Sequence, residues 1–211
     1  MHNNTPILTA IKQLKRSVFT TREAAAAAGK TLSNSIQTLN HLEKKGIILK
    51  ISRGVWALDI GNEKISPYSV IPFLLPSQRV YLSFTSALHL HDIIEQIPQT
   101  ITLASISHSK TIATKLGVFH IHRIAPSFFK GFNWYRDSGK FLIAEPEKAL
   151  IDCLYVSARK KKQFSYFPEL HFSKKFSFKK AKEWVRAIND PKIRLCVNKK
   201  LERILESQIK E

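Results

Sequence analysis

One short segment near the N-terminus is rich in polar and basic side chains and poor in acids. Between residues 30 and 45 the only acid is Glu43. Asn and Gln side chains can pair with the edge of adenine in the DNA major groove, whereas Ser, Thr and Lys side chains reach phosphates or base edges. The segment and the strand pair after it therefore indicate contacts to double-stranded DNA. The side chains expected to make them are Lys30, Thr31, Ser33, Asn34, Ser35, Gln37, Thr38, His41, Lys50 and Arg53.

Two helices have to hold these side chains. Residues 22–28 are rich in alanine, a strong helix former, and Gly29 suits a left-handed helix end. A second helix is predicted from Leu32 to about Lys45, where Gly46 stops it. Its predicted buried stripe has the spacing i, i+4, i+7 and i+10 and consists of Leu32, Ile36, Leu39 and Leu42. The polar side chains would then occupy the opposite face, which enters a major groove in helix-turn-helix proteins.

A further helix precedes this pair and a hairpin follows it. Four apolar residues share one face of the first helix: Ile7, Leu8, Ile11 and Leu14. Residues 47–51 and 55–58 are apolar and rich in β-branched side chains, with a Ser-Arg-Gly turn between them. This order predicts a winged helix-turn-helix over residues 1–62, with Lys50 and Arg53 in the wing. The alternative is a small helical domain that contacts other proteins through an ordinary polar face.

The charge of the chain indicates the same partner. Lys and Arg total 34 against 16 Asp and Glu, a net charge of +18 with a pI near 10.0. The net charge is +6 over residues 1–62, +2 over residues 63–155 and +10 over residues 156–211, so the excess lies at the two ends. Such an excess attracts phosphate polyanions. A generally Lys-rich protein with no special partner is the alternative explanation.

A proline-rich connector divides the chain. Pro67, Pro72 and Pro76 fall within ten residues and exclude a continuous helix or a central strand. We therefore expect a linker over residues 63–79 and a second domain over residues 80–211. The elements predicted in that domain are helices at 83–91 and from 145 onward, and strands at 100–104, 117–124 and 140–144. The predicted fold class is α+β, a winged helix-turn-helix followed by a mixed α/β domain.

The last third of the chain combines lysines with aromatic residues. Basic residues occur in runs at 159–162, 174–175 and 179–180, with Phe and Tyr between them. Such an alternation can hold single-stranded nucleic acid. We expect the aromatic rings to pack in the core and the lysines to form a nonspecific surface for the DNA backbone. The alternative for the lysines is a solvated face. Amphipathic helices are predicted at 177–188 and 193–205.

Three segments of the chain resemble the AbiEi family of antitoxins, from type IV toxin–antitoxin and phage-abortive-infection systems. The first is the hairpin from Gly46 to Leu58, and the second is Leu82-Ser83 with Ser86-Ala87-Leu88. The third and most recognisable is Ile-Ala-Glu-Pro-Glu-Lys-Ala-Leu-Ile-Asp at 143–152, preceded by Gly131-Phe132.

The resemblance implies a two-domain regulator. Its N-terminal domain would repress its own operon by binding inverted repeats in the operator. Its C-terminal domain would add to DNA binding and would counter a nucleotidyltransferase toxin without forming a stable complex with it. The partners implied are double-stranded DNA and, as a functional counterpart, the toxin.

Other chemistry has little support in the sequence. Two His-x-His pairs occur, His89 with His91 and His120 with His122. Asp92 is the only acid near either pair that could complete a metal site. Asp190-Pro191-Lys192 has the residue types of a nuclease site, but it lies at a predicted helix start and lacks a partnering strand motif. We expect no enzyme, no metal and no cofactor. The alternatives to a DNA-binding repressor are a protein-interaction adaptor with a basic surface and a nucleic-acid-modifying enzyme.

The sequence also predicts where the protein acts. No stretch reaches the roughly 18 consecutive apolar residues of a membrane helix, and the N-terminus lacks the pattern of a signal peptide. The two cysteines, Cys153 and Cys196, lie in apolar helical patterns typical of reduced core residues. We therefore expect a cytoplasmic protein with no membrane partner.

Overall fold

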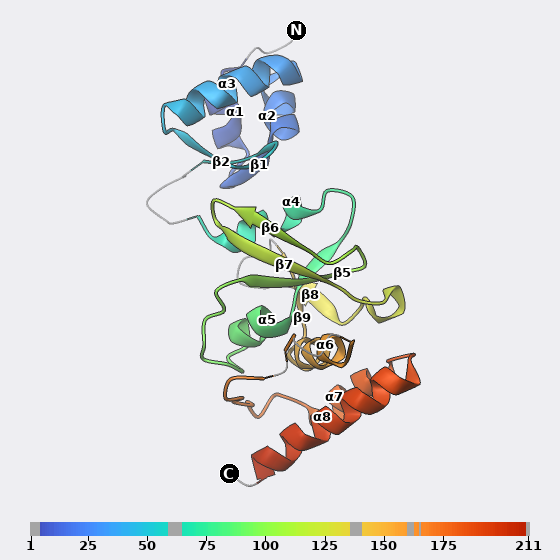
Figure 1. Ribbon diagram of the computed structural model, residues 1–211. Coiled ribbons are helices and arrows are strands. Elements are labelled where there is room, and N and C mark those ends of the chain that lie inside the picture. The colour runs from blue at the N-terminus through green and yellow to red at the C-terminus, as the bar shows by residue number, and fades with distance from the viewer. Residues whose placement is uncertain (1–4, 59–64, 136–140, 160–162, 165, 210–211) are drawn as a thin grey trace. The chain divides into compact units, whose positions relative to one another are not determined.

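The computed structural model describes residues 5–58, 65–135, 141–159, 163–164 and 166–209 (Figure 1). These residues form a mixed α and β structure, which confirms the predicted fold class at that level. The chain divides into two compact units. The first comprises residues 1–76 with 113–117, and the second comprises residues 77–112 and 118–211. The predicted domain end at residue 62 lies outside the described residues.

The first unit begins with a mixture of short helices and strands. Up to residue 58 its elements are α1 (Ile7–Gln13), β1 (Val18–Thr20), α2 (Thr21–Ala28), α3 (Leu32–Lys44), β2 (Ile48–Ser52) and β3 (Val55–Leu58). The three strands form one sheet in the order β1-β3-β2, with both pairings antiparallel. The short strand β1 was not predicted, because its strand character depends on pairing with β3, far along the chain.

Small and large apolar side chains share the core of this unit. Ala24 and Ala28 of α2 are buried in the same cluster as Leu39 and Leu42 of α3. Alanines at this contact let the two helices approach closely. Trp56 of β3 is 2 % exposed, and its indole N–H donates a hydrogen bond of 2.8 Å to the hydroxyl of Thr21. The tryptophan thereby joins the sheet to the start of α2 without leaving a buried donor unpaired.

The remaining elements begin within the expected connector. They are η1 (Pro67–Val70), α4 (Ile71–Leu74), β4 (Val80–Leu82), α5 (Phe84–Leu90), β5 (Ile101–Ser105), β6 (Lys110–Thr114), β7 (Gly117–Arg123), η2 (Pro126–Phe128), β8 (Phe132–Trp134), β9 (Leu142–Ala144), α6 (Pro146–Arg159), α7 (Phe178–Arg186) and α8 (Pro191–Ile209). The predicted strand at 140–144 starts within the undescribed residues. The prolines of the connector allow only the short turns η1 and α4.

A six-stranded sheet forms the centre of the second unit, in the order β6-β7-β5-β4-β9-β8. The sheet is mixed, since β4 runs antiparallel to β5 and parallel to β9. Helices α5 and α6 pack against each other on one face of the sheet, and α7 and α8 cover the far side of α6 (Figure 1). As a result, every residue of α6 from Glu147 to Ser157 is buried. Any charge on this stretch needs a partner inside the protein.

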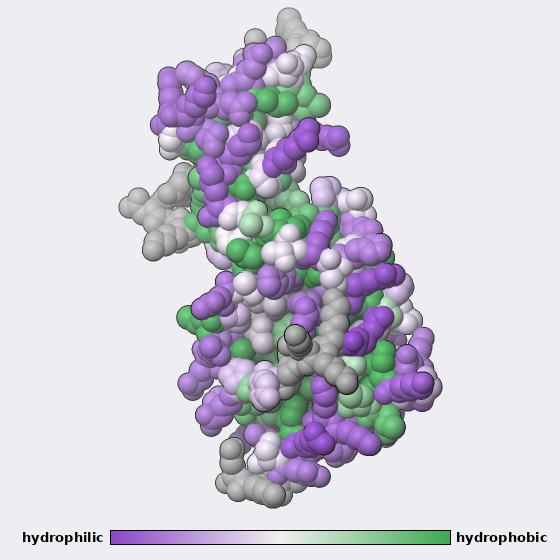
Figure 2. Space-filling view, viewed as in Figure 1, coloured by the Kyte–Doolittle hydropathy of each residue, from purple (hydrophilic) through white to green (hydrophobic). Residues whose placement is uncertain are grey.

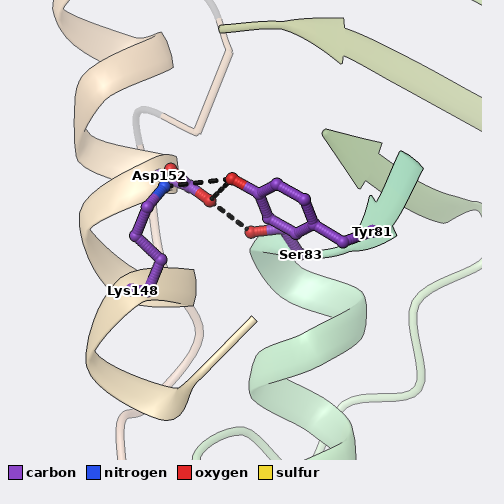
Figure 3. Close-up of polar contacts among 4 residues, drawn as sticks. All are labelled: Tyr81, Ser83, Lys148 and Asp152. Atoms are coloured by element: carbon purple, nitrogen blue, oxygen red, sulfur yellow. Dashed lines mark hydrogen bonds and ion pairs between the residues drawn. The ribbon is translucent and has the colours of Figure 1, made fainter. Parts of the chain in front are cut away.

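That partner is supplied by a buried polar cluster (Figure 3). Lys148 and Asp152, one turn apart on α6, form an ion pair with both side chains fully buried. The Asp152 carboxylate also accepts hydrogen bonds from the hydroxyls of Tyr81, at 2.9 Å, and Ser83, at 2.7 Å. The Lys148 ammonium donates to the Tyr81 oxygen at 3.0 Å and lies 4.0 Å from the centre of the Phe128 ring. The cluster thus ties α6 to β4 and to the start of α5.

Burial controls the ionisation of this cluster. Desolvation raises the pKa of the Tyr81 phenol well above its usual value, and the neighbouring Asp152 charge raises it further. The phenol therefore stays protonated and donates to the carboxylate. Desolvation lowers the pKa of Lys148, while the same carboxylate opposes that shift. Lys, Asp, Tyr and Ser side chains also serve in catalysis. Here all four are buried from solvent, and their contacts link α6 to β4 and to the start of α5.

Gly131 is the residue that lets the chain pass this cluster. Its φ of +80° is a conformation that favours glycine, and a Cβ there would overlap the Trp184 ring and lie 3.2 Å from Cγ of Lys148. The glycine of the Gly131-Phe132 pair is therefore required by close packing beside Lys148.

We expect that Asp152→Ala lowers the free energy of unfolding by about 3–5 kcal/mol, because it leaves a buried ammonium without its counterion. Urea denaturation followed by circular dichroism measures this loss. The matched control is Glu202→Ala, which breaks the solvent-exposed Lys182–Glu202 pair of 3.1 Å. That variant should lose at most about 1 kcal/mol. Equal losses in the two variants would contradict the structural role of the cluster.

Candidate nucleic-acid interface

The start of α2 is fixed by a reciprocal cap. The Thr20 hydroxyl accepts from the Glu23 backbone N–H at 3.2 Å, and the Glu23 carboxylate accepts from the Thr20 backbone N–H at 2.7 Å. The same carboxylate forms an ion pair with Arg16. Burial raises the pKa of Glu23, but the Thr20 hydrogen bonds and the Arg16 charge lower it more, and the net pKa is below the usual value. Glu23 is thus committed to the helix start and to Arg16.

A three-residue link joins α2 to α3. Gly29 ends α2 with a left-handed φ of 63°, and its N–H bonds back to the last turn. Thr31 then caps α3, because its hydroxyl accepts from the Asn34 backbone N–H at 3.3 Å. The short link fixes the direction in which α3 leaves α2. Thr31 was predicted to contact DNA, and its hydroxyl already serves this cap.

The structure places most of the predicted contact residues of α3 at the surface. Thr31, Ser33, Asn34, Gln37 and His41 are exposed, and Lys30 and Thr38 are half-buried. The Thr38 hydroxyl donates to the Asn34 carbonyl at 2.9 Å. Figure 2 shows hydrophilic side chains over much of the region where α3 and the start of β2 lie in Figure 1.

Ser35 was wrongly predicted to lie on the exposed face. Its side chain is fully buried, and its hydroxyl donates to the Thr31 carbonyl at 2.8 Å. This hydrogen bond satisfies the hydroxyl inside the helix, so a small serine can lie on the buried side of α3 at little cost. Ser35 therefore contributes to packing and is removed from the set of contact residues.

The predicted buried stripe of α3 was wrong in two of its four positions. Leu39 and Leu42 are buried, but Leu32 is 48 % and Ile36 is 45 % exposed. The helix is rotated so that Ser35 takes the inner position. Leu32 and Ile36 consequently join the outer surface, one turn apart, beside Ser33 and Gln37. They were missed because a hydrophobic pattern assigns every apolar residue at helical spacing to the core.

The hairpin exposes one basic side chain and packs another against a tryptophan ring. Arg53 is exposed at the tip, where Gly54 has a φ of +76°. Lys50 is half-buried, with its ammonium 5.1 Å from the centre of the Trp56 ring. A change of register between Lys50 and Ser52 bends β2 next to this contact.

The basic surface of the second unit is only partly committed to ion pairs. Lys174, Lys175 and Lys179 are exposed. Lys180 pairs with Glu145 at 3.1 Å and with Glu147 at 3.7 Å. Burial lowers the pKa of Lys180, but the two carboxylates raise it more, to a net value above the usual one. Lys160, Lys161 and Lys162 lie outside the described residues.

Several of the aromatic rings between these lysines pack against other rings. Phe172, Phe176 and Phe178 form a mutual cluster with ring centres 4.5–5.0 Å apart. Phe164 stacks on Phe84 at 5.0 Å. These four rings therefore have packing partners within the protein and differ from a row of exposed stacking platforms. Tyr166, by contrast, is 93 % exposed, so the expectation that the rings pack in the core is wrong for this residue.

The His-x-His pairs have contacts of their own. A ring nitrogen of His89 lies 3.3 Å from the Ile94 carbonyl, and one of His91 lies 2.7 Å from the Ala144 carbonyl. The rings of His120 and His122 meet edge to face, 6.4 Å apart. Within the described ranges, no three His, Cys, Asp or Glu side chains gather as a metal site would require. Over the same residues, no helix is both long and apolar enough to span a bilayer.

A helix pair whose second helix exposes polar and basic side chains is typical of the DNA-contacting domain of a transcriptional regulator. Residues 7–58 of the chain match the family model described as "Transcriptional regulator, AbiEi antitoxin". The match runs from the first residue of α1 to the last residue of β3 and confirms the resemblance for this part of the chain. The chain has no match among curated proteins.

Proposed function

We propose that the chain is a DNA-binding transcriptional repressor whose first domain is a winged helix-turn-helix. In this assignment α2 and α3 are the helix-turn-helix, α3 enters the major groove, and the β2–β3 hairpin is the wing. The observation that carries the proposal is the outer face of α3, on which Ser33, Asn34 and Gln37 are exposed. The only acid of that helix is the half-buried Glu43 near its end. An acid on this face would be repelled by the phosphates that line the groove.

Each proposed contact residue has a defined role toward a base or a phosphate. Asn34 and Gln37 carry the amide groups that pair with adenine, and His41 lies one turn beyond Gln37. Lys30 and Thr31 stand at the N-terminus of α3, a position that favours phosphate oxygens. The remaining proposed contacts are Ser33, Thr38, Lys50 and Arg53.

Leu32 and Ile36 extend this surface with apolar groups. An apolar side chain in the major groove can contact the 5-methyl group of thymine, which distinguishes thymine from the other bases. Ile36 lies next to Gln37, so one helix turn would carry both an adenine-pairing amide and a thymine-contacting aliphatic group. This combination suits an A·T-containing operator.

The antitoxin part of the proposal rests on the family match of residues 7–58 and on the resemblance of the 143–152 segment. We propose that the chain represses its own operon at inverted repeats and counters a nucleotidyltransferase toxin without a stable complex. The exposed Lys174, Lys175 and Lys179 would add contacts to the DNA backbone.

A mobility-shift titration tests the repressor function directly. The protein is titrated against the DNA upstream of its own coding region and against a permuted duplex of equal length and composition. Asn34→Ala with Gln37→Ala should reduce the free-energy difference between the two duplexes by about 1–3 kcal/mol for each base-pairing amide that is removed.

The matched control for that double variant is Thr9→Ala with Gln13→Ala, an exposed pair on α1. It should discriminate between the duplexes as the wild type does. Unchanged discrimination in the α3 variant, with folding intact, would remove α3 from the reading of bases. Absence of any preference in the wild-type protein would favour the adaptor instead.

Thymine contact by Ile36 is tested with deoxyuridine, which lacks the 5-methyl group. We expect single thymine-to-deoxyuridine changes in the operator to weaken wild-type binding by about 1 kcal/mol at contacted positions. In Ile36→Ala the same changes should have no effect, because the apolar partner is already absent. Leu195→Ala, which changes an exposed leucine on α8, serves as the control. An identical deoxyuridine effect in the wild type and in Ile36→Ala refutes the contact.

The basic surface of the second unit is tested by the salt dependence of DNA affinity. The slope of log K against log salt is about −0.9 per neutralised phosphate. Lys174, Lys175 and Lys179 changed together to Gln should flatten the slope by as much as about 2.7 without altering sequence preference. Lys180→Gln should have little effect, since its charge is engaged by Glu145 and Glu147. Coinciding slopes for the wild type and the triple variant would assign all DNA contacts to the first domain.

A further inference from the structure

A hollow of about 400 Å³ opens within the second unit. Its walls come from the loop before β6, the end of β7 and the last turns of α6. The residues that line it are His108, Ser109, His122, Arg123, Val156 and Arg159. No acid is among these lining residues. The hollow therefore concentrates cationic and hydrogen-bonding groups around a space large enough for a small molecule.

The two guanidinium groups retain their charge for a ligand. In the part of the chain that the structure describes, neither Arg123 nor Arg159 forms an ion pair with Asp or Glu. Arg159 is held by a neutral group, because it donates to the Tyr155 hydroxyl at 3.3 Å and lies 5.7 Å from the centre of that ring. The arginine is thus oriented without being neutralised.

Two further polar groups of the lining, Ser109 and His122, are also held in place. The Ser109 hydroxyl accepts from the Arg123 backbone N–H at 2.9 Å, so its own hydrogen remains available to donate. His122 is 7 % exposed and packs edge-on against Phe84 and Phe164, with ring centres 4.8 and 5.2 Å away. This packing limits the rotation of the imidazole. A site whose groups are ordered before binding loses less entropy when a ligand arrives.

A second hollow, of about 280 Å³, shares Arg159 and provides an internal comparison. Asp190 is among its lining residues. A carboxylate in the wall repels an anion, so the two hollows differ in the ligand charge that they favour. Only the larger one has a wholly cationic and neutral polar lining among the residues that the structure describes.

We propose that the larger hollow binds the phosphate monoester of a small molecule of nucleotide size. Arg123 and Arg159 present planar forks that match phosphate oxygens bidentately, and Ser109 and His108 donate to the remaining oxygens. The volume exceeds that of a phosphate group and leaves room for a body such as a nucleoside. A duplex presents its phosphates on a convex surface, so the free monoester fits the concave wall better. This inference does not depend on the proposed repressor function.

Isothermal titration of the full chain with adenosine 5′-monophosphate tests the site, with adenosine as the probe that lacks the phosphate. Saturable binding of the nucleotide, more than about tenfold tighter than that of adenosine, is expected. Arg123→Gln with Arg159→Gln should weaken nucleotide binding by more than about tenfold. Lys192→Gln with Lys199→Gln removes two exposed charges from α8 and should leave nucleotide binding unchanged.

Arg123→Lys with Arg159→Lys keeps both positive charges. This variant tests whether misfolding, and not the loss of the guanidinium groups, explains weaker nucleotide binding. It should weaken nucleotide binding, because an ammonium cannot donate bidentately as a guanidinium does, while the thermal melting curve stays that of the wild type. Equal binding of nucleotide and adenosine, or equal loss in the α8 control, would overturn the proposal. So would a loss of duplex DNA affinity in the Arg-to-Gln variant greater than in the α8 control, because the phosphates would then be those of DNA.

Discussion

The buried hydroxyl of Ser35 determines which face of α3 the protein offers to a partner. It donates to the Thr31 carbonyl one turn earlier and lies on the inner side of the helix with Leu39 and Leu42. A large residue at this buried position would overpack the inner side of α3. The rotation of α3 turns Ser33, Asn34 and Gln37 outward and brings Ile36 to the surface with them. The proposed base contacts therefore follow from a packing constraint on the opposite side of the helix.

The second unit depends on a different constraint, the burial of α6 on all sides. A helix in that position cannot carry charges unless they are paired, and Lys148 and Asp152 pair with each other and with two hydroxyls. These two residues belong to the 143–152 segment by which the second domain resembles the AbiEi family. Their presence there is explained by folding, since they hold α6 to β4. Among the described residues of this unit, the exposed lysines and the Arg123–Arg159 hollow remain available for anionic ligands.

The helices could be predicted from the sequence because their signals are local. Alanine content, threonine caps and glycine stops define α2 and α3 within a few residues. The face of α3 could not be predicted in the same way. Two stripes share Leu39 and Leu42, one continuing through Leu32 and Ile36 and the other through Ser35, and hydropathy alone favours the wrong one. The choice depends on how the neighbouring elements pack against α3, which is a tertiary property.

Short strands and concave sites were missed for a related reason. Strand β1 and strands β4 and β8 are each three residues long and depend on partners distant in the sequence. The Arg123–Arg159 hollow joins the end of a strand to the last turn of a helix 36 residues further along the chain. Neither residue has a local pattern that indicates a site. Chain topology alone brings them together.

The outer face of α3 is proposed to read DNA bases. The most direct measurement is the ¹⁵N-edited NMR spectrum of the side-chain amides of Asn34 and Gln37, recorded with the operator duplex and with a permuted duplex. Both amide groups should shift with the operator and stay close to their unbound positions with the permuted duplex. The side-chain amides of Asn189, just before α8, and of Asn198, within α8, should shift with neither duplex. A complex that forms on the operator while the Asn34 and Gln37 amides remain unshifted would contradict the reading of bases by α3.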